Sequence, residues 1–305
     1  MGQSGGAGSI IHHITAEGGN TSVPFSRAII QSPGWEYINK QSVWDRVLST
    51  ASEIANTEVS NGADLAALNF TELNQLNGAL VFGSPNGSFT FSPTVDGEYV
   101  PDYPNNLLNQ GRFNPDIVLL IGHTANEAGV FVSPEVDTEE KLRHGLEHAF
   151  AEFLPDAIEY ILTELYPPPG ETDLYATEYE RACLIVAESS FVCNTRALAT
   201  AFGNQTYNYR FDVPPALHMQ DIPWTFYHGN DSAVIPEIAE MMQAYFAAFS
   251  RKGNPNLEHG LPEWFVYGQE ANILTFGAEG VGDSVDDARN GRCDFWQSGL
   301  YRKKY

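Results

Sequence analysis

The chain has 305 residues, of which 43% are hydrophobic and 18% charged, a balance typical of a globular protein rather than a disordered one. Its 16 basic and 39 acidic residues give a formal net charge of −23 at pH 7, which disfavours binding to nucleic acid or to anionic lipid. No apolar run reaches the roughly 18–20 residues that a membrane-spanning helix needs, so we expect no membrane span.

The chain opens with Gly2-Gln3-Ser4-Gly5-Gly6, which has the Gly-x-Ser-x-Gly spacing of a nucleophile elbow. In an elbow the serine lies on a tight strand-to-helix turn, and the two outer glycines avoid collisions of a Cβ with the neighbouring strand and helix. The N–H of Gly5 would then point at a developing oxyanion. An ordinary flexible turn fits the pentapeptide equally well, unless an acid and then a histidine follow it in the chain.

Further along, short apolar runs alternate with helix-like segments, which predicts an α/β fold. We expect strands at 27–31, 116–121, 207–211 and 272–276, the second of them a continuous apolar run that suits a parallel strand covered on both faces. Glu127 comes just after the second strand, and catalytic groups lie at the carboxyl ends of parallel strands. An isolated loop glutamate is usually solvated, but in this position Glu127 can orient a histidine and stabilise its imidazolium form.

Residues 142–165 are predicted to be helical in two pieces, broken at Pro155. The first piece contains His144, Glu147 and His148, the His-x-x-Glu-His pattern of an inverted zinc-peptidase site. An amphipathic helix with solvated histidines is the preferred interpretation, because no third metal ligand is obvious. We therefore expect no metal and no other cofactor.

His218 is the preferred general base among the eight histidines. It lies on a loop after the aromatic strand 207–211 and follows Glu127 in the chain, whereas His123 precedes that acid and breaks the required order. His12 and His13 fall on the helix after the elbow, where packing roles are expected. A last amphipathic helix is predicted at 236–252, and no linker divides the chain, which favours one domain over 1–305.

Several segments, in this order, resemble the type-B carboxylesterases, the family that holds the cholinesterases and many fungal esterases and lipases. They are the serine region 2–13 and the segments 25–32, 93–98, 121–129, 215–226, 253–256 and 292–296. The family usually has Gly-Glu-Ser-Ala-Gly around the serine and glycine directly after the acid, so Gln3, Gly5 and Ala128 are departures. The resemblance implies an α/β-hydrolase fold, with a mostly parallel sheet flanked by helices.

The resemblance also implies a serine carboxylic-ester hydrolase that forms an acyl-enzyme on small-molecule esters. It gives Ser4 as the nucleophile, Glu127 as the acid, His218 as the base and the Gly5 N–H as an oxyanion-hole donor. The alternatives are a non-catalytic adhesion or binding protein with the same fold and, third, the zinc peptidase described above.

Further residues gain roles from the resemblance alone. Ser32 and Glu188 resemble positions that support the triad from behind, although structural roles fit them nearly as well. Three cysteines allow one disulfide, and the resemblance pairs Cys193 with Cys293 and leaves Cys183 as a buried free thiol.

Five Asn-x-Ser/Thr sequons favour a glycosylated, secreted product. They begin at Asn20, Asn69, Asn86, Asn204 and Asn230. In related esterases the elbow follows about half of the sheet, so the resemblance implies the C-terminal portion of a longer secreted esterase. We therefore expect the strand that delivers Ser4, the oxyanion loop and the signal peptide to be absent, and the chain to be inactive or poorly folded without its N-terminal half.

Overall fold

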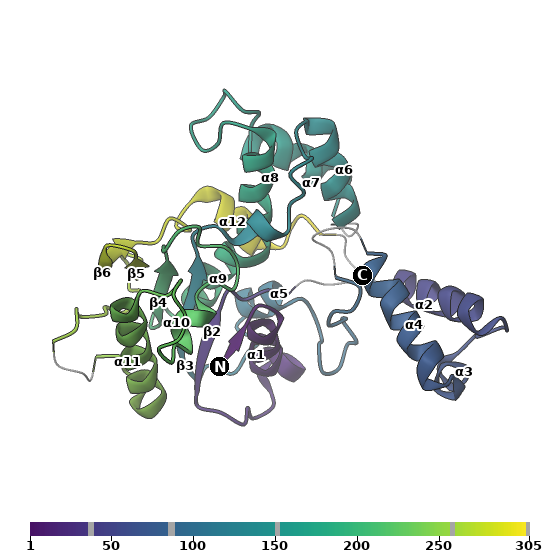
Figure 1. Cartoon of the computed structure of the whole chain (residues 1–305), viewed down its shortest axis with the longest axis horizontal. Helices are drawn as coiled ribbons and strands as arrows, with labels where there is room; N and C mark the ends of the chain where they lie inside the picture. The colour runs from purple at the N-terminus through teal and green to yellow at the C-terminus, as the bar shows by residue number, and fades with distance from the viewer. Residues whose placement is uncertain (36–39, 85–88, 150–152, 257–259, 303–305) are drawn as a thin grey trace. The chain divides into compact units, whose positions relative to one another are not determined.

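A sheet of six strands, in the spatial order β1-β2-β3-β4-β5-β6, organises the first of two compact units (Figure 1). The computed structural model describes residues 1–35, 40–84, 89–149, 153–256 and 260–302. Strands β1 to β5 are parallel, and β6 pairs antiparallel with β5. The strands are β1 (Gly2–Gln3), β2 (Arg27–Gln31), β3 (Val118–Thr124), β4 (Tyr207–Phe211), β5 (Asn272–Gly277) and β6 (Gly280–Val285).

The four predicted strands are confirmed as β2 to β5, with β3 lying a few residues later than expected. β2 and β3 are almost wholly buried, as their continuous apolar runs require. The expectation that the strand before Ser4 is absent is wrong, because Gly2 and Gln3 form β1 in parallel register with Ile30 and Gln31. β6 was not predicted, because its glycine-rich and half-exposed residues give no apolar run.

Helices cover both faces of the sheet (Figure 1). On one face α1 contacts β1 and β2, α9 contacts β3, and α5 and α12 pack beside them. On the other face α11 contacts β2 and β5, and α10 packs against α11. These helices are α1 (Gly5–Thr15), α5 (Pro104–Asn109), α9 (Cys193–Ala201), α10 (Ile222–Thr225), α11 (Pro236–Lys252) and α12 (Gly291–Ser298). The predicted α/β architecture is therefore confirmed.

Helix α11 follows the sequence pattern closely. It begins at Pro236, whose missing N–H has no partner to lose in the first turn. Its apolar residues at helical spacing, among them Met242 and Phe249, are buried in the core between α11 and the sheet. Burial of each such side chain stabilises the folded state by roughly 1.5–3 kcal/mol. The helix ends at Gly253, which takes the left-handed conformation with φ of 72°.

A second group of helices precedes α9 in the chain. It consists of α6 (Glu139–Ala149), α7 (Pro155–Tyr160) with the π-helical turn η3 (Ile161–Leu165), and α8 (Glu178–Ala187) with the π-helical turn η4 (Glu188–Val192). The break predicted at Pro155 is confirmed, since α7 begins there. The stretch Glu178–Ala201 is long and apolar enough to cross a membrane, but most of it is buried inside the molecule, as in the core helix of a soluble protein.

The predicted disulfide is confirmed: Cys193 on α9 and Cys293 on α12 are bonded, with their Cα atoms 5.0 Å apart. Cys183 is the third cysteine, and it is half-buried rather than fully buried. Two short 3₁₀ helices complete the first unit, η1 (Ala16–Gly19) and η2 (Glu127–Val130).

The second compact unit, Glu36–Thr94, lies in the sequence between β2 and β3. Its helices are α2 (Lys40–Ala55), α3 (Gly62–Ala67) and α4 (Phe70–Phe82). Val47 and Ala51 from α2 pack with Leu76 and Leu80 from α4 to form a small core of its own. An insertion between neighbouring strands is compatible with one domain, so the single-domain interpretation of 1–305 stays a prediction.

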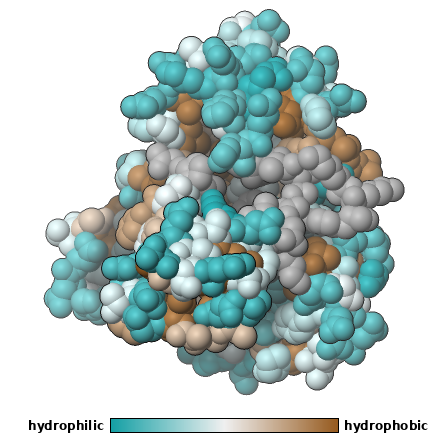
Figure 2. All heavy atoms as spheres, turned by 90° about the vertical axis from the view of Figure 1, so that its right-hand side faces the viewer, coloured by the Kyte–Doolittle hydropathy of each residue, from teal (hydrophilic) through white to brown (hydrophobic). Residues whose placement is uncertain are grey.

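On the face that Figure 2 shows, hydrophilic residues predominate and hydrophobic ones are scattered.

Candidate active site

Ser4 joins β1 to α1 in a strained backbone conformation. Its φ of 55° and ψ of −125° lie in a region that costs a residue with a side chain about 1–3 kcal/mol. The Ser4 N–H donates to the carbonyl of Gln31 across 2.9 Å, which extends the β1–β2 ladder by one residue. The Ser4 carbonyl accepts the Gly8 N–H at 2.9 Å, which starts α1. The serine is therefore fixed between a strand and a helix at the carboxyl edge of the sheet.

Close backbone approaches explain two glycines near this turn. A Cβ at Gly2 would overlap the carbonyl oxygen of Gly6, and a Cβ at Gly8 would overlap the carbonyl oxygen of Gly34. Apart from its chain neighbours and the backbone of its own helix, a Cβ at Gly6 would meet no heavy atom of the described residues within 4 Å. The expectation that both outer glycines of the pentapeptide avoid collisions is therefore right for Gly2 and wrong for Gly6. Gly8, rather than Gly6, is the second glycine whose missing Cβ avoids a collision.

Glu127 and His218 form a buried pair. Glu127, in η2, is fully buried, and its Oε2 is hydrogen-bonded to Nδ1 of His218. Its Oε1 accepts the Thr124 N–H from the end of β3 at 2.7 Å. The acid and base loops are joined through their backbones, because the Asn126 N–H donates to the Ala216 carbonyl at 2.9 Å. A carboxylate in this position can hold an imidazole proton on Nδ1, which leaves Nε2 able to accept one.

The second ring nitrogen of His218 faces the serine turn. Nε2 lies 3.1 Å from the side-chain nitrogen of Gln3, the residue before Ser4. Two phenyl rings bound the imidazole: the centroid of Phe191 lies 4.5 Å from it and that of Phe131 5.1 Å. The structure thus brings His218 and Glu127, the predicted base and acid, to the strand that precedes Ser4.

A buried polar network lies behind this pair. Asp221, three residues after His218, accepts the Tyr209 hydroxyl at 2.6 Å and the Gln31 side-chain amide at 2.9 Å. Burial raises the pKa of Asp221 from 3.8 to about 6, and burial together with the Asp221 charge raises the pKa of Tyr209 well above 10. Asp221 was not predicted as a site residue, although the His-x-x-Asp spacing of residues 218–221 is a signal for it.

Comparison with known proteins identifies the family. A model described as the carboxylesterase family matches residues 1–296. The chain belongs to this family. It is 35% identical over 301 residues to carboxylesterase patB of Aspergillus clavatus, covering 97% of this chain and 54% of that protein. It is also 25% identical over 313 residues to a secreted lipase of Arthroderma benhamiae, covering 97% of this chain and 59% of that protein.

The structural comparison agrees on the fold. The crystal structure of Aspergillus niger EstA matches with a TM-score of 0.81 at 19% sequence identity, covering 98% of this chain and 63% of that one. The predicted α/β-hydrolase fold is therefore confirmed for this member of the carboxylesterase family. The chain spans little more than half the length of the curated relatives that it matches.

The two residues expected behind the triad differ in their surroundings. Ser32 follows β2 with a positive φ of 47°, is fully buried, and its Oγ has no hydrogen-bond partner among the described residues. Glu188, in η4, accepts Nε of Arg292 at 2.8 Å and Nη2 at 2.7 Å, and also the Tyr166 hydroxyl. These bonds join η4 to α12 beside the disulfide, and a position of Glu188 that supports the triad stays a prediction.

The zinc pattern lies on an exposed face of α6. His144, Glu147 and His148 are all exposed, and the two imidazole centroids are 6.2 Å apart.

On α1, His12 is buried, and burial with the neighbouring His13 lowers its pKa to about 4, so it is neutral at pH 7.

Elsewhere among the described residues, three side chains of kinds that can bind a metal ion lie close together. Ligand atoms of His123, Asp286 and Asp287 lie within 4.8 Å of one another. Asp286 already accepts the Tyr267 hydroxyl at 2.9 Å, and Asp287 accepts Nη1 of Arg210 at 3.2 Å. Because both carboxylates are bound by side-chain donors, the group is better described as an ion-pair and hydrogen-bond cluster.

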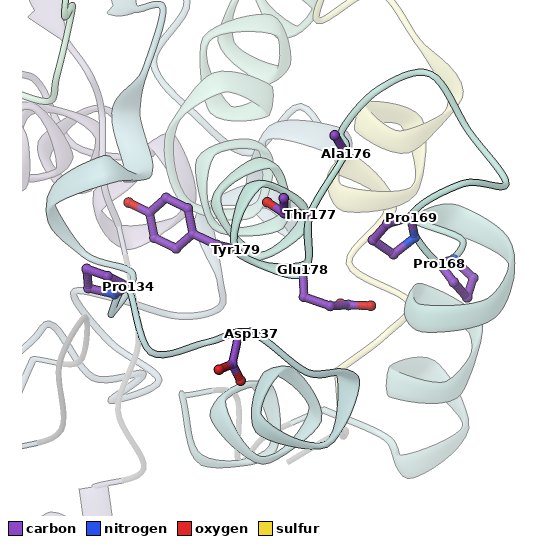
Figure 3. A pocket seen from close by; sticks show the side chains of 8 residues that line it. All are labelled: Pro134, Asp137, Pro168, Pro169, Ala176, Thr177, Glu178 and Tyr179. Carbon is purple, nitrogen blue, oxygen red and sulfur yellow. The ribbon is translucent and has the colours of Figure 1, made fainter.

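A cavity of about 690 Å³ lies at the start of α8 (Figure 3). It is lined by Pro134, Asp137, Pro168, Pro169, Ala176, Thr177, Glu178 and Tyr179. Its two carboxylates already have cationic partners, Asp137 with Lys141 at 2.7 Å and Glu178 with Arg181 at 3.0 Å. None of the predicted catalytic residues Ser4, Glu127 and His218 lines it.

The sequons are mostly accessible. Asn20, Asn69 and Asn230 are exposed and Asn204 is half-buried, while Asn86 lies outside the described residues. The side-chain oxygen of Asn69 also caps α4 by accepting two backbone N–H groups.

Proposed function

We propose that the protein is a serine carboxylic-ester hydrolase in which Ser4 is the nucleophile, His218 the general base and Glu127 the acid that orients it. One observation carries the proposal: the strained serine turn and the buried Glu127–His218 pair lie at the same edge of one sheet. The turn keeps the hydroxyl at the end of β1, and the pair fixes an imidazole whose Nε2 lies toward that strand, 3.1 Å from the Gln3 side-chain nitrogen. Family membership supports this chemistry.

In the first half of the reaction, Ser4 Oγ attacks the ester carbonyl carbon while His218 Nε2 takes the hydroxyl proton. The imidazolium is stabilised by Glu127, whose burial makes this electrostatic interaction stronger than it is in water. Gly5 is the first residue of α1, where a backbone N–H has no acceptor within its own helix, so it is a suitable donor to the oxyanion. His218 then returns the proton to the leaving alcohol, and an acyl-Ser4 ester remains.

In the second half, water replaces the alcohol. His218 Nε2 takes a proton from the water as its oxygen adds to the acyl carbon. The tetrahedral intermediate then collapses to the carboxylic acid, and His218 returns its proton to Ser4 Oγ, which restores the hydroxyl. The chain's own side chains supply every proton transfer in this scheme. We therefore propose a small-molecule carboxylic ester as the substrate and assign no cofactor.

The proposed location is extracellular. Disulfides persist in oxidising compartments, and this fold contains the pair Cys193–Cys293. At least three sequons are exposed, as glycosylation requires, and one relative is named a secreted lipase.

The test measures hydrolysis of p-nitrophenyl acetate by the wild-type protein, Ser4→Ala and Ser9→Ala. Each is prepared as these 305 residues and with any upstream residues encoded in frame. Ser9 is a matched control, because it is exposed on the same helix and its hydroxyl donates to the Gly5 backbone carbonyl. We expect Ser4→Ala to lose about 10⁴-fold or more in kcat, and Ser9→Ala to keep its activity. Unchanged hydrolysis in Ser4→Ala would exclude the proposed mechanism.

A further inference from the structure

The exposed face of α6 carries two histidines at the spacing of a chelating pair. His144 and His148 are four residues apart, so their side chains leave the same face of the helix one turn from each other. Both are exposed, and their ring centroids are 6.2 Å apart with an angle of 34° between the ring planes. The opposite face holds Leu142 and Leu146, which are buried with side chains of α7 and α8. The helix that carries the two imidazoles is therefore anchored by its apolar face, while the rings themselves are accessible.

The distance between the rings is close to what one metal ion requires. A zinc ion binds an imidazole nitrogen at about 2.0–2.1 Å, so two imidazoles on one ion have their centroids roughly 5 Å apart. The rings of His144 and His148 therefore need to approach by about 1 Å. Small rotations about the side-chain bonds of two exposed residues supply such a movement. Imidazole nitrogens suit Zn²⁺ and Cu²⁺, whereas Mg²⁺ and Ca²⁺ prefer oxygen ligands.

The charges on α6 also favour a cation at this face. Its basic residues, Lys141 and Arg143, are both paired with carboxylates, which reduces their repulsion of a metal ion. Glu140 lies one turn before His144 on the same face, Glu147 follows within the same turn, and both carboxylates are exposed. The formal net charge of the whole chain, −23, adds a general attraction for cations.

We propose that His144 and His148 together form a surface binding site for one divalent ion of the Zn²⁺ and Cu²⁺ class. Two nitrogen ligands come from the protein, and water fills the remaining positions. The site binds the ion and has no catalytic role, because a zinc peptidase needs a third protein ligand. Both ligands belong to adjacent turns of one helix, so a bound ion is expected to hold α6 against local opening. The inference goes beyond the proposed ester hydrolysis and uses none of its residues.

The informative variants change the number or the placement of the histidines. His144→Ala/His148→Ala removes both ligands, and Gly145→His/His148→Ala keeps two histidines on α6 but places them on different faces. Beyond its chain neighbours and its own helix, a Cβ at Gly145 would meet no heavy atom of the described residues within 4 Å, so the new side chain fits. These replacements raise helix propensity, and both variants are expected to fold. His228→Ala is the matched control, because it removes an exposed histidine outside α6.

Zn²⁺ binding to the four proteins is measured by isothermal titration calorimetry at neutral pH. We expect the wild type and His228→Ala to bind the ion equally tightly. The affinity is expected to fall by about tenfold or more in the other two variants, because the second imidazole no longer binds at a high effective concentration. The cluster of His123, Asp286 and Asp287 is common to all four proteins, so any binding there cancels in the comparison. The proposal is overturned if either α6 variant binds as many Zn²⁺ ions as tightly as the wild type does.

Hydrogen exchange followed by mass spectrometry then locates the ion. Saturating Zn²⁺ is expected to slow exchange in peptides from α6 of the wild type and of His228→Ala, and to leave Gly145→His/His148→Ala unchanged in this region. Exchange in α6 that is insensitive to Zn²⁺ in the wild type, or equally slowed in the rearranged variant, rejects the site. Neither measurement uses ester hydrolysis, so a failure of the proposed catalytic function and a failure of this inference are distinguishable.

Discussion

Asp221 is expected to make the stability of the fold depend on pH in an unusual direction. Its carboxyl group is fully buried, one of its oxygens accepts two hydrogen bonds, and the other has no partner among the described residues. Burial raises its pKa from 3.8 to about 6. The folded protein therefore binds this proton more tightly than the unfolded chain does, and stability falls as the pH rises from about 4 to about 6.

The magnitude follows from the pKa difference between the two states. At ~1.4 kcal/mol per pH unit, a rise of the pKa from 3.8 to about 6 corresponds to about 3 kcal/mol. Asp221→Asn keeps the shape and an oxygen for Tyr209 and Gln31 but has no proton to lose. Relative to this variant, the wild type is expected to lose about 2.4 kcal/mol of unfolding free energy between pH 4 and pH 7, since part of the loss occurs below pH 4.

The assay is urea unfolding of both proteins at intervals from pH 4 to pH 7, with the difference in unfolding free energy plotted against pH. All other carboxylates are common to both proteins, so their contributions cancel to first order. Asp116→Asn, at an exposed site, is the control, and its difference is expected to change little with pH. A flat difference for Asp221→Asn, or one in which the wild type gains stability toward pH 7, would refute the reasoning.

Three further predictions concern the disulfide, the helix after the serine and the acid. Replacing both Cys193 and Cys293 by serine is expected to lower the free energy of unfolding by about 4–5 kcal/mol, because the bond closes a loop of 100 residues. Urea unfolding measures this loss, and a loss below ~1 kcal/mol would contradict the prediction. Gly8→Ala is expected to destabilise the fold by about 2 kcal/mol or more, because the added Cβ meets the backbone carbonyl of Gly34. Gly6→Ala places its Cβ in open space and is expected to be neutral or stabilising. Equal melting temperatures of the two variants would be the contrary result. Glu127→Gln is expected to lower kcat about 10³–10⁴-fold with a smaller effect on KM, and steady-state kinetics showing less than a tenfold loss would remove it as the acid.

Elements with strong local signals were predictable. The apolar run before Glu127 and the helix from Pro236 to Gly253 were found from sequence because burial on both faces, or on one helix face, leaves a pattern in the residue order. β1 was missed since a strand of two residues has no period to detect. The helices of the second unit were not predicted, although Asn69 and Glu72 form a capping box that marks the start of α4.

Only the part of the site that follows from the order of residues along the chain could be predicted. Ser4, Glu127 and His218 were selected because they follow strands in the order this fold uses. The partners that surround His218 come from distant segments, Phe191 from a π-helical turn and Gln3 from β1. No local pattern in the sequence encodes such contacts, because tertiary packing alone decides which side chains meet.

The most direct measurement is the mapping of a fluorophosphonate adduct by tandem mass spectrometry after the protein has been incubated with the reagent at neutral pH. The reagent bonds covalently to a serine whose hydroxyl is activated by a base. A single adduct on Ser4, lost when His218 is replaced by alanine, is the expected result. An adduct on a different serine, or labelling of Ser4 that continues unchanged without the imidazole, would contradict the catalytic assignment.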